Sequence, residues 1–411
     1  MHRTSRFEET KMTSDWSAYA QEQGFGRELG EVLVRAARAS RGPYLTTGDL
    51  LQSLVRDTGP AGMACTALGL GPGRIERPLE ELAVSPEPPA AQAPALSAPA
   101  SEVFFHTQDE SDMLGLQTSG ALLLALRLDR RGLPTAPGVA PAAPGHGELV
   151  LEMLGIERPG LRRAVLEAVA QTHPDTRGWD ARCEAYLRLS RFHLACTDAQ
   201  GRRHGQEIPA PVREEAACLP AMALHYLQAS PEDLRWLSHA LYDGQKKWFV
   251  VRLVRMTESL PPALLEPLLC AALFEQDANR NRHFVEAAVR AVGNASVFER
   301  LLGYMRLGDE AEKAGAMRAL YWCSPPDAAA GREVARGLLD AFLRETDLDV
   351  RRSAISNLAG IAWSTLDAGL QGQMREVLKA AASHPDVYIR HRADFIRSEA
   401  QGALPIKGWP R

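Results

Sequence analysis

Residues 44–54 read YLTTGDLLQSL, and residues 116–126 repeat the same pattern as LQTSGALLLAL. Thr47 and Ser119 occupy the same place in the two copies, and an apolar helix face begins three residues after each. A hydroxyl at this place is typical of a helix N-cap, so the pattern predicts one helix start in each copy. The N-terminal half therefore contains an internal duplication of helical segments, which decides its fold class.

A second pair of segments extends this duplication. Residues 63–70 match residues 149–156, and Gly69 and Gly155 each follow an apolar segment where a helix end favours positive φ. The members of this second pair are farther apart in the chain than the members of the first pair. The extra length coincides with a Pro-rich stretch at 133–146, which we interpret as an insertion in the second copy. Another Pro-rich stretch, at 86–101, is interpreted as the linker between the copies.

The duplicated pattern resembles the Clp N-terminal repeat domain over roughly residues 20–170. The resemblance rests on three segments of the first copy: residues 25–29, 32–37 and 44–51. Gly48 and Asp49 stand where that family has an acid and a histidine, and Gly120-Ala121 makes the same departure in the second copy. The resemblance implies two four-helix repeats that bind substrate proteins or adaptors and do no chemistry. Because these surface residues differ, it does not imply the family's usual adaptor contacts.

The C-terminal half repeats a different unit. Lys313, Arg351 and Arg390 each stand three residues before an alanine, and these alanines recur at a nearly constant interval. The interval is close to the period of roughly 40 residues in HEAT and armadillo units. Asp349 and Asp386 precede two of the helices, where a carboxylate favours a helix start.

The spacing in this half resembles a HEAT-repeat solenoid of four to five helix pairs over residues 231–400. Residues 171–230 are expected to form a helical connector that caps the solenoid. The whole chain is therefore predicted to be all-α: two degenerate Clp-type repeats followed by a HEAT-like solenoid. We expect inner helices at 246–256 and 281–292, and outer helices at 231–242, 262–274, 329–343 and 365–382.

Composition and charge exclude several classes of protein. The 411 residues are 45% hydrophobic, and 47 Lys and Arg stand against 51 Asp and Glu, a formal net charge of −4. No overall field therefore draws nucleic acid or an anionic membrane to this chain. No apolar run approaches the roughly 18 residues of a membrane span, and the first residues lack the apolar core of a signal peptide. We expect a soluble protein of a bacterial cytoplasm.

No motif in the sequence points to catalysis, a metal or a cofactor. The chain contains no HExxH, no GxSxG, no phosphate-binding GxxxxGK[ST] and no CxxC pair. His193 and Cys196 can share a helix face, but Cys183 lies almost three turns earlier and cannot join them. We therefore predict that the protein is not an enzyme and that it holds neither a metal nor a cofactor.

The inner helices of the second half supply the candidate partner-binding residues. Arginine and tryptophan are enriched in the energetic centres of protein interfaces. The same arginines could instead bridge neighbouring repeats through carboxylates such as Asp349 and Asp386. Residues 231–411 hold 24 basic and 23 acidic side chains, so no net field favours phosphate. The candidates are Arg282, Arg351, Arg390, Lys246, Lys247 and Trp248.

These observations predict a non-enzymatic adaptor or scaffold, in which the Clp-like domain and the solenoid each bind a protein partner. Two alternatives stay open at the level of the sequence. One is a helical-repeat protein that binds nucleic acid, and the other is an accessory protein of an immunity or secretion system.

Overall fold

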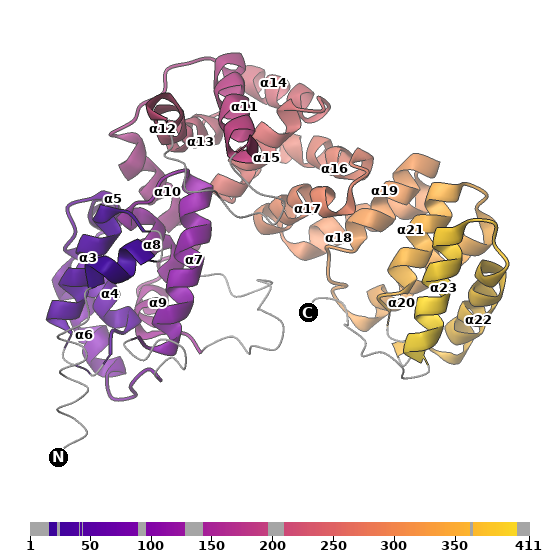
Figure 1. Ribbon diagram of the computed structural model, residues 1–411, viewed down its shortest axis with the longest axis horizontal. Coiled ribbons are helices and arrows are strands. Elements are labelled where there is room, and N and C mark those ends of the chain that lie inside the picture. Colours follow the sequence, from indigo (N-terminus) through magenta and orange to yellow (C-terminus); the bar gives the residue numbers. More distant parts are fainter. Residues whose placement is uncertain are drawn as a thin grey trace. The chain divides into compact units, whose positions relative to one another are not determined.

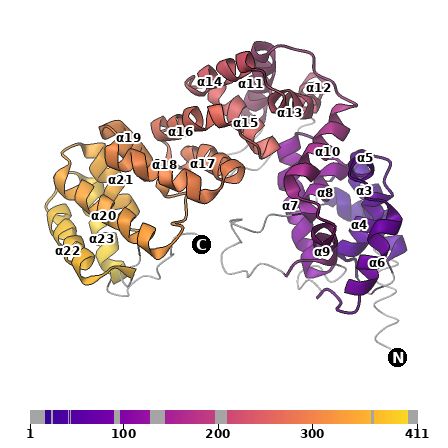
Figure 2. The ribbon, with the colours of Figure 1, turned by 180° about the vertical axis from the view of Figure 1, so that it is seen from behind.

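The chain is almost entirely helical, as its periodicity predicts. The computed structural model describes residues 16–22, 25–40, 42, 44–88, 96–127, 143–195, 209–361 and 365–400. Within these residues, the only β-type pairing is an isolated bridge between Leu45 and Leu96. The prediction of an all-α protein is confirmed. The chain divides into two compact units, Met1–Ala229 and Ser230–Arg411, coloured indigo to magenta and red to yellow in Figures 1 and 2.

The first unit contains two sets of four helices with the same order. Gly69 and Gly155 have φ of 67° and 70°, so the prediction of left-handed residues at these helix ends is confirmed. The first set is α3 (Arg27–Ala39), α4 (Thr47–Val55), α5 (Pro60–Ala67) and α6 (Pro72–Leu82). The second set is α7 (Ala98–Leu114), α8 (Ser119–Leu126), α9 (His146–Met153) and α10 (Arg158–Ala170). The other described helices are α2 (Trp16–Glu22), α11 (Trp179–Ala195), α12 (Ala210–Ala217) and α13 (Leu219–Leu227), of which α13 packs on α10.

The two sets of helices pack against each other, and each set makes equivalent contacts with the other. Helix α5 packs on α8 and α10 of the other set, while α9 packs on α4 and α6. Gly147 N donates to Thr47 Oγ1 at 2.9 Å, and Ala61 N donates to Ser119 Oγ at 3.1 Å. Thr47 and Ser119 are equivalent positions of the duplicated pattern, and so are Ala61 and Gly147. The same hydrogen bond is therefore made twice, once from each set to the other.

Thr47 and Ser119 are not the helix caps that the sequence pattern predicts. Helix α4 is capped one residue earlier, by Thr46, whose side chain accepts from Asp49 N while the Asp49 carboxylate accepts from Thr46 N. Asp49, which departs from the family pattern, thus completes a capping box. The hydroxyls of Thr47 and Ser119 instead serve the other set of helices, which a local pattern cannot reveal.

The two Pro-rich stretches lie partly outside the described residues. Of the stretch 86–101, residues 89–95 are outside them, and residues 98–101 form the first turn of α7 rather than a linker. A proline in the first turn of a helix costs no hydrogen bond, which explains how Pro99 enters α7. Of the stretch 133–146, residues 133–142 are outside the described part and His146 already opens α9.

The second unit consists of helices that alternate between two layers. The even-helix layer is α14 (Pro231–Leu241), α16 (Leu265–Phe274, after a short 3-10 turn), α18 (Asn294–Leu307), α20 (Ala328–Arg344) and α22 (Ala368–Ala382). The odd-helix layer is α15 (Lys246–Thr257), α17 (Ala278–Val292), α19 (Glu310–Leu320), α21 (Leu348–Leu358) and α23 (Val387–Ala400). Each even helix packs on the odd helix that follows it, and successive odd helices pack on one another.

Helix α18 is absent from the sequence-based expectation for this unit. It begins directly after Gly293, whose φ of 89° turns the chain from α17 within one residue. The predicted helix at 281–292 ends where α17 ends, just before Gly293, but no helix was predicted for residues 294–307. The cap of α21 is also corrected, because Asp347 is its N-cap and Asp349 lies in its first turn.

Candidate functional site

The six candidate residues all lie on the odd-helix layer of the second unit. Lys246, Lys247 and Trp248 open α15, Arg282 lies on α17, and the remaining two arginines lie on α21 and α23. The structure therefore brings them to one layer, as the inner-helix prediction requires. Their contacts decide whether they face a partner or hold the layer together.

Lys247 and Trp248 are used within the unit. Lys247 Nζ forms an ion pair with Glu275 Oε2 at 2.8 Å, and both side chains are more than four-fifths buried. The same ammonium lies 5.6 Å from the ring centre of Phe284, and Trp248 packs on that ring at 4.9 Å. Lys246 lies 5.5 Å from the Trp236 ring. The first turn of α15 is thus held against α17 and against the turn that precedes α17.

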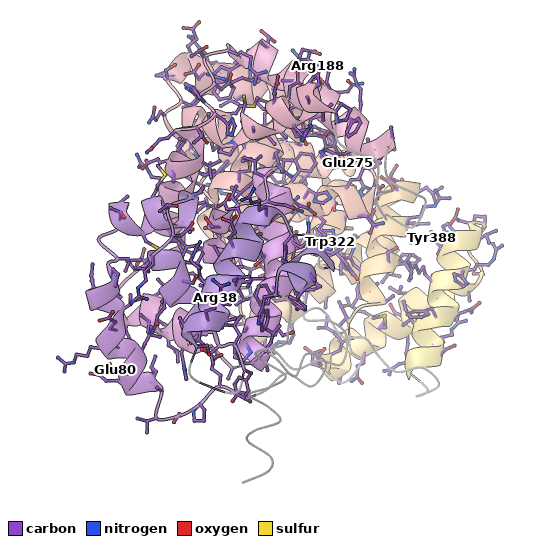
Figure 3. All side chains as sticks on the ribbon, turned by 60° about the vertical axis from the view of Figure 1, so that its left-hand side comes forward. Arg38, Glu80, Arg188, Glu275, Trp322 and Tyr388 are labelled. Carbon is purple, nitrogen blue, oxygen red and sulfur yellow. The ribbon has the colours of Figure 1, made fainter. Side chains whose placement is uncertain are left out.

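Arg282 and its neighbours join α17 to the end of α19. The Arg282 guanidinium forms an ion pair with Glu286 at 2.6 Å and stacks 5.1 Å from the ring of Trp322, which is labelled in Figure 3. Trp322 Nε1 donates to Asn281 Oδ1 at 2.9 Å. The tryptophan therefore fills the gap between successive odd helices.

Arginines of α19, α21 and α23 continue the same pattern. Arg318 pairs with Asp349 at 2.8 Å, and Arg352 pairs with Asp386 at 2.5 Å. Arg318 and Arg352 thus bridge successive odd helices through these two carboxylates, whereas the candidates Arg282, Arg351 and Arg390 contact other groups. Arg351 donates to Glu345 O at 2.6 Å, and Arg390 donates to the main-chain carbonyls of His384 and Pro385. Most of the candidate basic residues therefore hold successive helices together.

His283 lies at the centre of the α15–α17 contact and is the group whose titration bears on the stability of the unit. Burial lowers the pKa of His283 below its usual 6.5, and the guanidinium of Arg255, 3.3 Å from Nδ1, lowers it further. Arg282 also lowers this pKa, while the carboxylate of Glu286 opposes the shift. The folded unit therefore favours the neutral imidazole.

We expect this histidine to make the second unit less stable in mild acid. Because the pKa is lower in the folded than in the unfolded chain, its contribution is fully present above pH 6.5 and is lost as the pH falls below that value. From about pH 7.5 to about pH 5.5, the unfolding temperature of the wild type should fall more than that of His283→Gln. The exposed His173 of the first unit gives the control, His173→Gln. Equal losses in the wild type and His283→Gln would contradict this assignment.

The odd-helix layer is basic and the even-helix layer is nearly neutral, although the unit as a whole carries almost equal numbers of basic and acidic side chains. The odd helices hold 14 Lys or Arg and 6 Asp or Glu, whereas the even helices hold 8 and 7. The balancing carboxylates are concentrated in the connecting turns. The pattern disappears when residues 231–411 are counted together, because helix assignments are needed to sort the charges by layer.

Exposed apolar side chains gather at the turns that lead from each even helix to the following odd helix. We call these five turns the turn row: residues 242–245, 275–277, 308–309, 345–347 and 383–386. Seven large apolar side chains are exposed in the described part of the second unit. Five of them lie in or next to the turns, one at each turn. A sixth, Tyr388, lies close to the fifth turn. We call these five residues the apolar row: Tyr242, Phe274, Leu307, Leu348 and Val387, exposed by 64, 56, 89, 41 and 69%.

The apolar row is not predicted from the sequence, because a single apolar residue at a helix end has no periodicity of its own. A faint signal is present, since Phe274, Leu307 and Val387 each lie within three residues of an aspartate that starts the next helix. Isolated exposed apolar residues are normal, but these five recur at the same place in five successive helix pairs.

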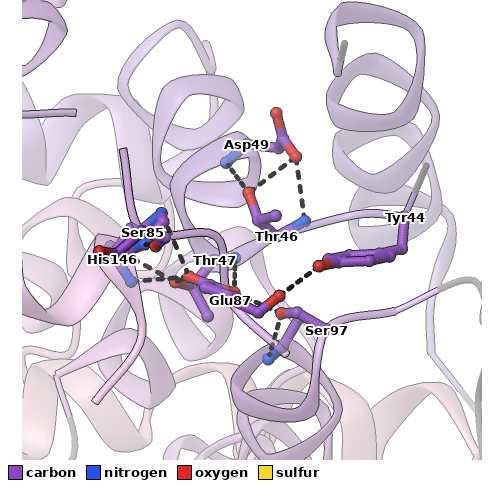
Figure 4. A network of polar contacts seen from close by, with 10 residues as sticks. Tyr44, Thr46, Thr47, Asp49, Ser85, Glu87, Ser97 and His146 are labelled. Carbon is purple, nitrogen blue, oxygen red and sulfur yellow. Dashed lines mark hydrogen bonds and ion pairs between the residues drawn. The ribbon is translucent and has the colours of Figure 1, made fainter. Parts of the chain in front are cut away.

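The first unit contains a buried polar network centred on Glu87 (Figure 4). The Glu87 carboxylate, 4% exposed, accepts from the main-chain N–H of Thr47 at 3.1 Å and of His146 at 2.6 Å. The hydroxyls of Thr47 and Ser97 donate to it as well. Four donors converge on one carboxylate, and the Ser97 hydroxyl also accepts from the main-chain N–H of Ala100. Glu87 thus ties together the starts of α4, α7 and α9.

The structure adds two findings on other kinds of site. Within the described residues, no three His, Cys, Asp or Glu side chains gather where they could hold a metal ion. Cys183 is buried in α11, and Cys196 lies outside the described part. No helix in that part is long and apolar enough to cross a membrane.

Comparisons with known proteins give this chain no relative. No protein-family model, no curated protein and no solved structure matches it.

Proposed function

We propose that this protein is a non-enzymatic adaptor or scaffold that binds other proteins. In this proposal the first unit is a pair of Clp-like repeats, the second is a HEAT-like solenoid, and each unit binds a protein partner. The apolar row is the observation that carries the proposal for the second unit. Exposed apolar side chains that recur at each helix pair present a continuous contact surface, and burying such surface is the main driving force of protein association.

The ion pairs between successive helix pairs support a scaffold role. Ion pairs such as Lys247–Glu275 and Arg352–Asp386 connect each helix pair to the next. In a solenoid, each repeat touches only its neighbours, so such contacts fix the spacing of the turns. A fixed spacing lets the apolar row meet a partner without the entropic cost of first ordering the surface.

The test of this proposal removes apolar side chains from the row without disturbing the core. The row variant carries Phe274→Ser, Leu307→Ser and Val387→Ser. The first unit offers a matched control with the same three residue types, equally exposed: Phe105→Ser, Leu194→Ser and Val84→Ser, at 71, 75 and 86% exposure. Each substitution should change stability by about 0.5 kcal/mol or less, because exposed side chains contribute little to folding.

We expect affinity capture with the purified full-length chain to recover a partner with the wild type and with the control. The row variant should bind that partner at least tenfold more weakly, since losing about 1 kcal/mol from each of two or three apolar contacts exceeds a factor of ten. Equal capture by the row variant would contradict a role of the apolar row in binding.

Nucleic-acid binding is the second candidate function, and the basic odd helices are the observation that favours it. The ion pairs weigh against it, because Lys247, Lys313, Arg318 and Arg352 each already contact a carboxylate at 2.8 Å or less. Phosphate binding would have to displace these acids. We therefore expect no shift of duplex DNA or RNA in a gel at low salt. A shift that disappears steeply with added salt would establish this second function instead.

A further inference from the structure

We infer that the turn row binds an extended, positively charged segment of another protein that carries an apolar side chain about every third residue. This inference rests on the proposed function and specifies the chemistry of the partner. It follows from the continuity of the turns, their charge and their spacing.

The five turns lie side by side because side-chain contacts connect each to the next. Lys247, at the start of α15, reaches Glu275 in the second turn, and Cys270 Sγ near the end of α16 lies 3.9 Å from the hydroxyl of Tyr304 near the end of α18. Lys313 reaches Glu345 at 2.8 Å. The last connection is the Arg352–Asp386 ion pair. The five turns are therefore neighbours in order along one edge of the unit.

The charge of the turn row selects the partner. Its five turns contain seven carboxylates and no Lys or Arg: Asp243, Glu275, Asp277, Asp309, Glu345, Asp347 and Asp386. Glu275, Asp277, Glu345 and Asp386 form ion pairs with Lys247, Arg280, Lys313 and Arg352, which balance their charges. The exposed carboxylates of Asp243 and Asp309 remain for a partner. They favour a segment with basic and apolar side chains over a phosphate backbone.

The spacing of the row sets the backbone conformation of the partner. Packed helices lie about 8–10 Å apart, so we expect successive turns of the row to recur at about that distance. A polyproline II segment rises about 3.1 Å per residue and repeats every three residues, or about 9.3 Å. One face of such a segment can place an apolar side chain on each turn of the row. An α-helix needs about six residues to advance the same distance and does not present one face at that interval.

The acidic caps permit a test of charge that keeps the helix starts intact. Asp277 and Asp309 cap α17 and α19 through their side chains. Asparagine caps a helix about as well as aspartate does. Asp277→Asn with Asp309→Asn therefore removes two negative charges and keeps the caps; we call this the charge variant.

The experiment selects binders from a displayed library of random peptides of about 16 residues, long enough to span the row. The bait is the full-length chain, with the row variant and the matched control as parallel baits. Enriched peptides should be net positive, with apolar residues at a spacing of three. The best peptide, made synthetically, should bind the wild type and the control at least tenfold more tightly than the row variant, by fluorescence anisotropy. It should bind the charge variant several-fold more weakly than the wild type.

The outcomes separate this inference from the proposed function. Enriched peptides that need the apolar row but are neutral or acidic would overturn the inference and leave the binding function standing. Equal binding of a basic peptide to the charge variant and the wild type would also overturn the inference. If no enriched peptide distinguishes the wild type from the row variant, both the inference and the role of the row are wrong.

Discussion

Replacing Gly315 with alanine should destabilise the second unit by about 3 kcal/mol. Gly315 lies inside α19, where α19 crosses α16. A Cβ added there would stand 2.2 Å from the main-chain carbonyl oxygen of Leu273, a distance that no side-chain adjustment relieves. The two helices would have to separate, although alanine itself favours the helix by about 1 kcal/mol over glycine.

Gly303→Ala provides the matched control for this substitution. Gly303 also lies inside a helix of the second unit, α18, but a Cβ there meets nothing within 4 Å. This control should stabilise the unit by about 0.5–1 kcal/mol. Hydrogen exchange of the full-length chain localises the effect, because two units can unfold separately and a single midpoint then reports neither. Faster exchange in α16 and α19 is expected for Gly315→Ala alone. Equal protection in both variants would refute the close crossing.

Glu87→Gln should destabilise the first unit by about 3 kcal/mol. Each oxygen of the Glu87 carboxylate accepts two hydrogen bonds, Oε1 from Thr47 and His146, and Oε2 from Thr47 and Ser97. A glutamine amide replaces one oxygen with an N–H donor of the same size. Two buried donors then lose their acceptor, and each such loss costs about 1–3 kcal/mol.

Glu80→Gln, at an exposed site on α6, is the control for the loss of a carboxylate charge in the same unit. Its unfolding free energy should stay within about 0.5 kcal/mol of the wild type. For Glu87→Gln, exchange should accelerate at the starts of α4, α7 and α9 together, because one side chain joins them. Acceleration confined to one of the three helices would show that Glu87 does not couple them.

Much of the helical architecture could be predicted from local pattern. The apolar spacing after Thr47 and Ser119 indicated helices that are present, and the glycines at 69 and 155 indicated the left-handed helix ends that are observed. These features follow from the chain within a few residues of each site. Helix α18 was not predicted, although the break at Gly293 that precedes it was placed correctly at the end of the 281–292 helix.

The candidate site was predictable only in part. The sequence directed attention to basic and aromatic residues on the odd helices, and the structure places all six on that layer. The ion partner of Lys247, Glu275, is 28 residues away and lies in the turn before α17. The apolar row could not be predicted, because each of its members belongs to a different helix pair and they become neighbours only when the helices stack.

The sequence by itself determined that the chain is helical, where several helices of its second half lie, and that its first half is duplicated. These properties depend on periodicity, capping and proline, which act over one or two helical turns. Only the tertiary structure decided what the polar and exposed side chains do. It directed the hydroxyls of Thr47 and Ser119 to the other repeat, neutralised the arginines with carboxylates of the next helix pair, and aligned five isolated apolar residues. The reason is physical: hydrogen bonds, ion pairs and apolar contacts depend on distances in space, and stacking brings together residues that the chain keeps far apart.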